Sequence, residues 1–391
     1  VNTDPERLKS AGFKRSGFNA PLRIAFDGKR AAGNFTGLGN YSRYIINILA
    51  THFPENKYLV YIPRKLEKAG DLESKPPIII CHPKKAGNKS IWRSFGITRD
   101  LRNDRVDIYH GLSNEIPFGL KKAGIKAVVT IHDLIFLRYP HYYPWFDRKI
   151  YDFKFRYACR NAQKIIAISE QTKRDIVKYY NIPESHIEII YQNCHPGFYK
   201  EYSHEAIETI KNRYSLPGKF LLNVGTIESR KNLLLIVKAL KNVDPAIHLV
   251  VIGRDTPYSE KVKEFITKNN LSQRVLFLKN VPIEDLPAIY RQAEIFLFPS
   301  EFEGFGIPIV EAIHSRIPVI AATGSCLEEA GGPGSIYIRP DDEIAFANAI
   351  NLVLNSPDKK QAMVEAGTEY VKRFSNHLIA DKLMTLYKNL H

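Results

Sequence analysis

Short apolar runs alternate with longer helix-like stretches along most of this chain, and this alternation restricts the fold more than any other feature. The strand-like runs of the first half are Leu22–Phe26, Tyr58–Ile62, Ile78–Cys81, Asp107–His110, Ala127–Ile131 and Lys164–Ile168. Helix-like stretches separate them, as from Leu38 to Ala50. Strands that are apolar throughout and separated by helices are typical of a parallel sheet with helices on both faces. We therefore expect an α/β fold of the doubly wound, Rossmann-like kind.

The alternation stops between Cys194 and Glu201, where His195, Pro196 and Gly197 predict a turn, and then starts again. The later strand-like runs are Phe220–Val224, His248–Gly253, Val275–Leu278, Ile295–Pro299, Pro318–Ala321 and Ser335–Ile338. A chain of 391 residues exceeds the size at which one core usually stops growing. We predict two doubly wound domains, at 22–194 and 195–374, that face each other across a cleft. An N-terminal extension at 1–21 precedes them, and a C-terminal helix at 375–391 can pack on the first domain.

The net charge of +15, from 56 basic and 41 acidic residues, favours a negatively charged partner. Nucleic acid, an anionic membrane surface and a nucleotide diphosphate all fit this charge. The stretch Lys89–Arg105 mixes apolar and basic residues, namely Ile91, Trp92, Arg93, Phe95, Arg99, Leu101 and Arg102. It predicts either an amphipathic helix on a membrane surface or an ordinary helix with a solvated face.

The cysteines and the apolar runs bear on location. Cys81, Cys159, Cys194 and Cys326 form no C-x-x-C pair, which argues against a zinc ribbon or a disulfide framework. We found no run of about 18 apolar residues and no apolar signal segment at the N-terminus. We therefore expect a cytoplasmic protein, with peripheral attachment to the inner face of the cell membrane as an extension of that hypothesis.

The run from Pro299 to Ala312 follows an apolar strand and leads into a helix. Gly304 and Gly306 let backbone approach a ligand, and the amides after them predict a helix start that accepts phosphate or a sugar oxygen. Glu303 can accept hydrogen bonds from sugar hydroxyls, and Glu311, about two helical turns on, is predicted on the same side to hold a ribose. Singly, Glu303 could be a helix N-terminal acid and Glu311 a solvated residue.

The run from Leu222 to Leu233 holds Gly225, Arg230 and Lys231 at the end of the first strand of the second domain. Adjacent cations are poorly placed at a helix start, which predicts that they face a negative group such as a pyrophosphate. Gly225 leaves room for that phosphate. The alternative is a pair of solvated surface cations.

These two runs together resemble the family 4 retaining glycosyltransferases of the GT-B fold, also called glycosyltransferase group 1. The motifs that carry the resemblance are V-G-T-x-E-x-R-K-N-L and E-G-F-G-x-P-x-x-E-A, with Thr36–Tyr44, Thr130–Leu134, Ile168–Asp175 and Ser325–Glu329 as further matches. The resemblance implies a hexosyltransferase in which Glu303 contacts donor sugar hydroxyls and Glu311 holds the ribose. It implies that Arg230 and Lys231 bind the pyrophosphate.

The same resemblance assigns roles to five further positions. Backbone amides of Phe305 and Gly306 would bind the donor, and His132 would bond a donor hydroxyl beside the reacting anomeric carbon. Gly37 and Gly39 would shape a loop at the cleft, near phosphate or acceptor.

The expected reaction is transfer of a hexose from a nucleotide sugar to a glycan or lipid-linked acceptor in cell-envelope polysaccharide assembly, either lipopolysaccharide or exopolysaccharide. The resemblance favours mannose from GDP-mannose, with a UDP-sugar as the alternative donor, and implies retention of configuration. Since no D-x-D triplet occurs, we predict transfer without a metal or another cofactor. The rival hypotheses are a non-catalytic sugar-nucleotide binder and a nucleic-acid-binding protein, and we expect no nucleic-acid partner because the Glu pair would then lack a purpose.

Overall fold

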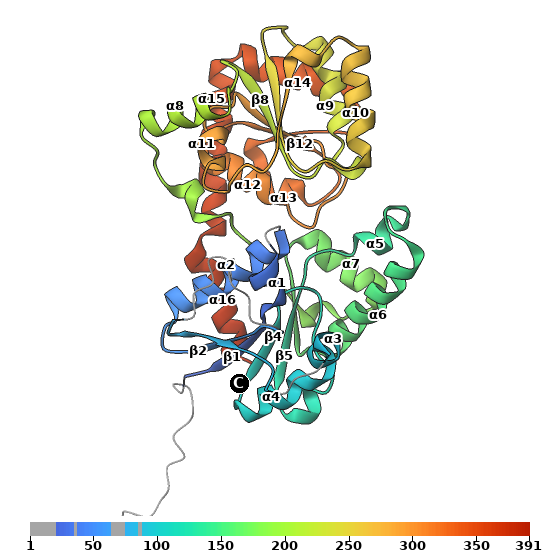
Figure 1. Cartoon of the computed structure of the whole chain (residues 1–391), viewed down its shortest axis with the longest axis vertical. Helices are drawn as coiled ribbons and strands as arrows, with labels where there is room; N and C mark the ends of the chain where they lie inside the picture. Colours follow the sequence, from blue (N-terminus) through green and yellow to red (C-terminus); the bar gives the residue numbers. More distant parts are fainter. Residues whose placement is uncertain (1–20, 35–36, 64–74, 85–87) are drawn as a thin grey trace, which may run out of the picture.

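The computed structural model describes residues 21–34, 37–63, 75–84 and 88–391, and it has two α/β domains stacked along its long axis (Figure 1). Residues 1–20, and with them nearly all of the predicted N-terminal extension at 1–21, lie outside the described residues. Thr36, the first residue of the Thr36–Tyr44 match, also lies outside the described residues.

Among its described residues, the first domain is built on a parallel sheet of seven strands in the order β3-β2-β1-β4-β5-β6-β7. The strands are β1 (Arg23–Asp27), β2 (Lys57–Tyr61), β3 (Ile78–Cys81), β4 (Ile108–Gly111), β5 (Lys126–Ile131), β6 (Lys164–Ala167) and β7 (Ile187–Ile189). The helices that pack around it are α1 (Gly28–Gly33), α2 (Gly37–His52), α3 (Lys89–Ile91), α4 (Ile97–Asn103), α5 (Ile135–Arg138), α6 (Trp145–Asn161) and α7 (Glu170–Tyr180). The strand order reverses between β1 and β4, which makes the fold doubly wound.

The second domain repeats this plan with six parallel strands in the order β10-β9-β8-β11-β12-β13. They are β8 (Phe220–Val224), β9 (His248–Ile252), β10 (Val275–Leu278), β11 (Ile295–Phe298), β12 (Val319–Ala322) and β13 (Ile336–Ile338). The helices are α8 (His204–Arg213), α9 (Leu233–Ala239), α10 (Pro257–Lys268), α11 (Leu286–Tyr290), α12 (Ile307–His314), α13 (Leu327–Gly331), α14 (Glu343–Asn355) and α15 (Pro357–Tyr370). The chain then continues into α16 (Asn376–Lys388), which lies in the first domain.

The predicted α/β fold class is confirmed, because both sheets are parallel and carry helices on both faces. Strand ends agree with the apolar runs to within a residue or two, since strands that are buried on both faces show a continuous apolar pattern. The exception is β7, a three-residue edge strand in which Glu188 is exposed, so its pattern is too short and too polar to detect.

Local sequence signals fix several helix starts. Ser169 caps α7 by accepting a hydrogen bond from the Thr172 amide. Thr256 and Ser259 form a reciprocal capping box at α10, whose first residue is Pro257.

The predicted single helix over Lys89–Arg105 is not observed. The segment consists of α3, a π-helical turn at Trp92–Gly96 and α4. Trp92 is buried, and its indole Nε1 donates to Asp100 Oδ2 at 2.8 Å, whereas Ile91 and Phe95 point outward to solvent. A wide turn interrupts the regular 3.6-residue periodicity on which the helix prediction relied.

The chain crosses between the domains twice, and the two crossings lie side by side. The first runs through Asn193 and Cys194, and the second enters α16, which packs against α2 of the first domain (Figure 1). Asn193 Nδ2 donates to Asn376 Oδ1 at 3.5 Å, and Tyr44 Oη of α2 donates to the same oxygen at 3.1 Å. Near the end of the chain, Tyr387 Oη lies 2.6 Å from Nδ1 of the buried His110.

Candidate active site

The two motif runs of the second domain meet at the carboxyl ends of neighbouring strands. β8 pairs with β11, and the strand order reverses between them, which is the position where open α/β sheets bind ligands. The chain leaves β8 through Gly225 and a 3₁₀ turn at Ser229–Lys231, and it leaves β11 through the loop that leads to α12. Arg230 and Lys231 therefore stand in a turn before α9 rather than on the helix itself.

Glu303 is the centre of a compact charge cluster. Its Oε1 accepts hydrogen bonds from Lys231 Nζ at 2.7 Å and Ser300 Oγ at 2.7 Å, and it lies 3.0 Å from Arg230 Nη1. Arg230 also pairs with Glu228 at 2.6 Å and donates to the carbonyl oxygen of Phe302. All three contacts reach the same carboxylate oxygen, so the second oxygen, Oε2, retains its capacity to accept from a sugar hydroxyl.

The charge of Glu303 is set by its neighbours. Burial disfavours the carboxylate and would raise its pKa, but the positive charges of Lys231 and Arg230 outweigh burial and lower the pKa of Glu303 to about 2. Glu303 is therefore ionised at neutral pH. The negative groups that the two cations contact here belong to the chain, namely Glu303 and Glu228. Binding of a pyrophosphate by this pair stays a prediction.

The loop between Glu303 and α12 is shaped by Gly306. Its φ of +120° is unfavourable for other residues, and a Cβ there would lie 3.1 Å from Leu327 Cδ2. The Phe305 ring is buried against Tyr191 and Phe374, and the predicted contact of its backbone amide with the donor stays a prediction. The Cys326 thiol, for which no role in the site was predicted, donates to the carbonyl oxygens of Glu303 at 2.9 Å and Phe305 at 3.2 Å.

The predicted helical relationship between Glu303 and Glu311 is wrong. Glu303 lies in the loop four residues before α12 begins, so the two carboxylates are not two turns apart on one helix face. Glu311 lies in α12 and accepts a hydrogen bond from Tyr290 Oη at 2.8 Å. Burial raises the pKa of Glu311 to about 7, and the bond from Tyr290 offsets part of that rise. Its proposed contact with a ribose stays a prediction.

His132 follows β5 of the first domain and lies against the glycine loop of the second. A Cβ on Gly304 would come within 2.4 Å of the His132 carbonyl oxygen, so the two backbones touch across the cleft. The ring is buried, with Nε2 2.8 Å from the Leu112 carbonyl oxygen. A carbonyl only accepts, so Nε2 carries the proton and Nδ1 offers a lone pair. Burial lowers the pKa of His132 to about 4, so the ring is neutral at pH 7 and can accept from a hydroxyl.

Gly37 and Gly39 lie in the first turn of α2 rather than in a loop. A Cβ on Gly39 would lie 1.7 Å from the Asn34 carbonyl oxygen, which makes glycine necessary where α2 meets the end of α1. Gly37 has open space around its Cα. Gly39 is thus required for packing, whereas Gly37 leaves the start of α2 accessible.

Two contacts across the cleft were not predicted. The Glu329 carboxylate accepts from the backbone amides of Glu170 at 2.6 Å and Gln171 at 3.1 Å, at the N-terminus of α7. Tyr142 Oη donates to Glu301 Oε2 at 2.7 Å. These bonds join residues 158 or 159 positions apart, so no local sequence pattern reveals them. They hold the two domains together around the site.

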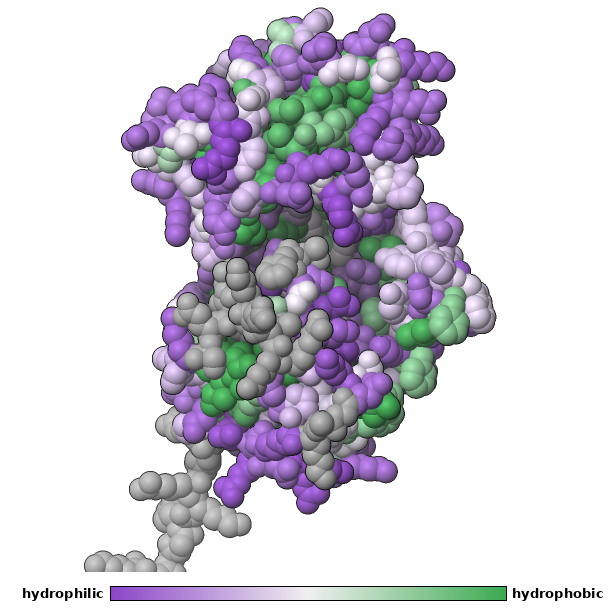
Figure 2. Space-filling view, viewed as in Figure 1, coloured by the Kyte–Doolittle hydropathy of each residue, from purple (hydrophilic) through white to green (hydrophobic). Residues whose placement is uncertain are grey.

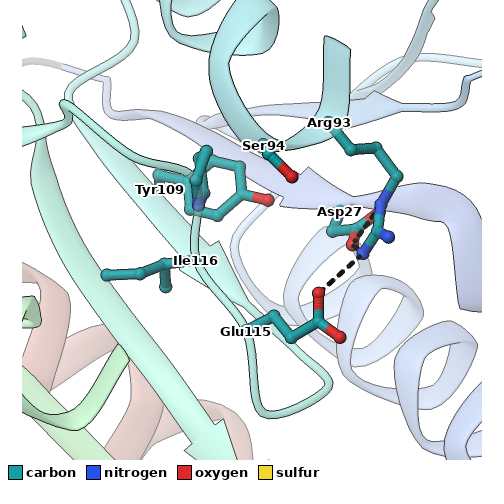
Figure 3. A pocket seen from close by; sticks show the side chains of 7 residues that line it. Asp27, Arg93, Ser94, Tyr109, Glu115 and Ile116 are labelled. Atoms are coloured by element: carbon teal, nitrogen blue, oxygen red, sulfur yellow. Dashed lines mark hydrogen bonds and ion pairs between the residues drawn. The ribbon is translucent and has the colours of Figure 1, made fainter. Parts of the chain in front are cut away.

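A polar pocket lies in the first domain, at the reversal between β1 and β4 (Figure 3). Arg93 reaches between two carboxylates there, pairing with Asp27 and lying 3.6 Å from Glu115. Lys154 Nζ is 3.3 Å from the same Glu115. The charged side chains of the pocket are therefore paired with one another. Asp27 also caps α1, so its ion pair with Arg93 links the π-helical turn to α1.

Within the parts of the chain that the structure describes, no three His, Cys, Asp or Glu side chains are grouped so that they could hold a metal ion. The need for a metal stays a prediction. In the same described ranges, no helix is long and apolar enough to cross a bilayer.

Comparison with known proteins assigns both halves of the chain to related families. Residues 207–370 match the family described as Glycosyl transferases group 1, and residues 47–192 match Glycosyltransferase Family 4. The chain is a family 4 glycosyltransferase. The glycosyltransferase has the GT-B fold of the Anabaena protein HepE in complex with UDP-glucose, with a TM-score of 0.76 at 18% identity over 94% of this chain and 100% of that one.

Two curated relatives are similar to this glycosyltransferase in sequence. O-antigen chain mannosyltransferase B of Escherichia coli is 23% identical over 397 residues, which cover 94% of this chain and all of that protein. O-antigen chain mannosyltransferase RfbU of Salmonella typhimurium is 26% identical over 255 residues, or 65% of each chain. In the glycosyltransferase, the cation pair, Glu303 and His132 meet where the two domains touch.

Proposed function

We propose that this glycosyltransferase transfers mannose from GDP-mannose, with retention of configuration, to a glycan or lipid-linked acceptor in cell-envelope polysaccharide assembly. The observation that carries the proposal is the match along the whole length of an O-antigen chain mannosyltransferase. A second O-antigen chain mannosyltransferase among the relatives supports the same sugar. The alternative donor is a UDP-sugar, which the similarity to a structure in complex with UDP-glucose favours.

The proposed reaction uses the charge cluster in two ways. Arg230 and Lys231 stabilise the nucleotide diphosphate as the bond from the anomeric carbon to the phosphate oxygen breaks. An acceptor hydroxyl forms the new bond on the same face, and its proton leaves with the departing phosphate. Glu303, through Oε2, and His132, through Nδ1, accept hydrogen bonds from donor hydroxyls and fix the sugar between the domains.

The pair of cations also supports transfer without a metal ion, because two positive charges already stand beside the proposed phosphate position. Activity should then be the same in EDTA as in added Mn²⁺. Activity that disappears in EDTA and returns with Mn²⁺ would contradict this part of the proposal.

The donor is identified by a panel of GDP-, UDP- and ADP-sugars, measured for donor hydrolysis and for the rise in melting temperature on binding. A ligand that binds only the folded protein stabilises it in proportion to its affinity. We expect GDP-mannose to give the largest rise and the fastest hydrolysis. A UDP-sugar that exceeds it in both measurements would replace GDP-mannose, and nucleotide binding without turnover of any donor would favour a non-catalytic binder.

A further inference from the structure

Six large apolar side chains on the outer flank of the first domain are open to solvent. They are Ile91, Phe95, Trp145, Phe146, Ile150 and Phe153, and their exposed fractions lie between 38% and 67%. We call this set the flank patch. Figure 2 shows hydrophobic side chains gathered on the side of the lower domain where Figure 1 draws α6. Isolated exposed apolar residues are common, but a cluster of this kind marks a contact surface.

Most of the flank patch comes from α6, a helix that is apolar on two sides. Its inner side buries Phe155 and Ala158 in the core of the first domain. Its outer side carries Phe146, Ile150 and Phe153, which recur at the spacing of one helix face. Packing within the domain explains only the inner side, so the outer one requires a different explanation.

The flank patch is continuous although its residues come from two distant segments. Phe118 stacks on Phe95 with ring centroids 4.8 Å apart, and it lies 6.3 Å from Phe153. The rings of the π-helical turn and of α6 therefore form one surface.

Basic residues accompany the flank patch on both segments. α6 holds five basic and two acidic residues, and the stretch Lys89–Asn103 holds four basic and one acidic. Lys149 Nζ lies 5.7 Å from the centre of the exposed Trp145 ring. A second copy of this chain would present the same positive charge and be repelled, whereas a negatively charged surface with an apolar interior matches both properties.

We propose that the flank patch docks on a membrane surface that contains anionic lipid. The rings would enter the headgroup region while the lysine and arginine side chains meet lipid phosphates. Trp145 stands three residues after Tyr142, which bonds to Glu301 across the cleft. Docking would thus place one edge of the cleft beside the bilayer. The proposal does not depend on which sugar is transferred.

The test is co-sedimentation of the whole protein with vesicles of phosphatidylcholine that contain about 30% phosphatidylglycerol. We expect the double variant Phe146→Gln/Phe153→Gln to bind at least about tenfold more weakly than the wild type. The matched control is Ile344→Gln/Leu352→Gln, two residues of α14 in the second domain that are about as exposed, at 55% and 53%, and it should bind like the wild type.

A charge variant separates the electrostatic contribution. Lys149→Glu should weaken binding to the anionic vesicles, and wild-type binding should fall with added salt and on pure phosphatidylcholine. Wild-type protein that stays in the supernatant with anionic vesicles would overturn the proposal, as would a loss of binding in the α14 control equal to that of Phe146→Gln/Phe153→Gln. A wild-type dimer that the Phe146→Gln/Phe153→Gln variant dissociates would show that a second copy covers the flank patch instead.

Discussion

Replacing Glu303 by glutamine gives a quantitative test of the charge cluster. Glutamine has the size of a protonated glutamate, so the substitution removes the charge and keeps the shape. Lys231 and Arg230 lower the pKa of Glu303 from 4.5 to about 2. At about 1.4 kcal/mol per unit, the ionised side chain contributes about 3 kcal/mol to the free energy of unfolding at pH 7. Glu303→Gln should lose roughly this amount.

The pH dependence follows from the direction of the shift. A carboxyl whose pKa is lowered in the folded state stabilises above its unfolded pKa, and this contribution is lost as the pH falls from 4.5 toward 2. The difference between wild type and Glu303→Gln should therefore shrink from about 3 kcal/mol at pH 7 to about 2 kcal/mol at pH 3.5.

Urea denaturation followed by far-ultraviolet circular dichroism is the suitable assay. Both tryptophans, Trp92 and Trp145, lie in the first domain, so their fluorescence would not report on the domain that holds Glu303. The control is Glu228→Gln, which breaks an ion pair with the same Arg230 at a side chain that is 39% exposed and should cost less than about 1 kcal/mol. A Glu303→Gln variant as stable as wild type at pH 7, or a difference that does not shrink in acid, would refute this reasoning.

Three further predictions concern the cleft. His132→Ala should lower turnover at least about tenfold with little change in nucleotide binding, and turnover equal to that of the wild type would refute the role of His132. In the wild type, the lowered pKa of His132 should make the free energy of unfolding decrease as the pH falls from 6.5 toward 4. Gly304→Ala should lower turnover by pushing a Cβ against His132, whereas Gly218→Ala, which meets open space, should be neutral in the same transfer assay. The affinity of the wild type for the nucleotide sugar, measured by calorimetry, should rise as Glu311 ionises around pH 7, and the affinity of Glu311→Gln should lose this pH dependence. A pH dependence that persists in Glu311→Gln would show that another group titrates.

The sequence predicted the parts of this molecule that local patterns determine. Both sheets follow from apolar runs, and the meeting of Arg230 and Lys231 with the Glu303 loop follows from the rule that parallel strands share a carboxyl edge. The predicted helix start after Gly306 is confirmed, but the position of Glu303 relative to α12 was wrong because Glu303 lies in the loop before that start, where helix periodicity does not apply. The contacts of Cys326 and Glu329 were not predicted because both side chains bond to segments far away in the chain.

The exposed apolar side of α6 was not predicted from the sequence, for a different reason. Its residues show helix periodicity, but the buried Phe155 and the exposed Phe153 are equally apolar, so sequence alone cannot separate the core face from the surface face.

The paired crossings at Asn193 and Asn376 have a mechanical consequence. A single linker would let one domain swing and twist freely against the other, but two adjacent linkers, bonded to each other and to Tyr44, confine the motion to rotation about one edge. Opening of the cleft would then move Gly304 away from His132 along one path. Closing would bring the two residues back to the same relative position in every catalytic cycle. Substitutions at Asn376 should thus alter how reproducibly the halves of the site meet, without touching any residue that binds sugar.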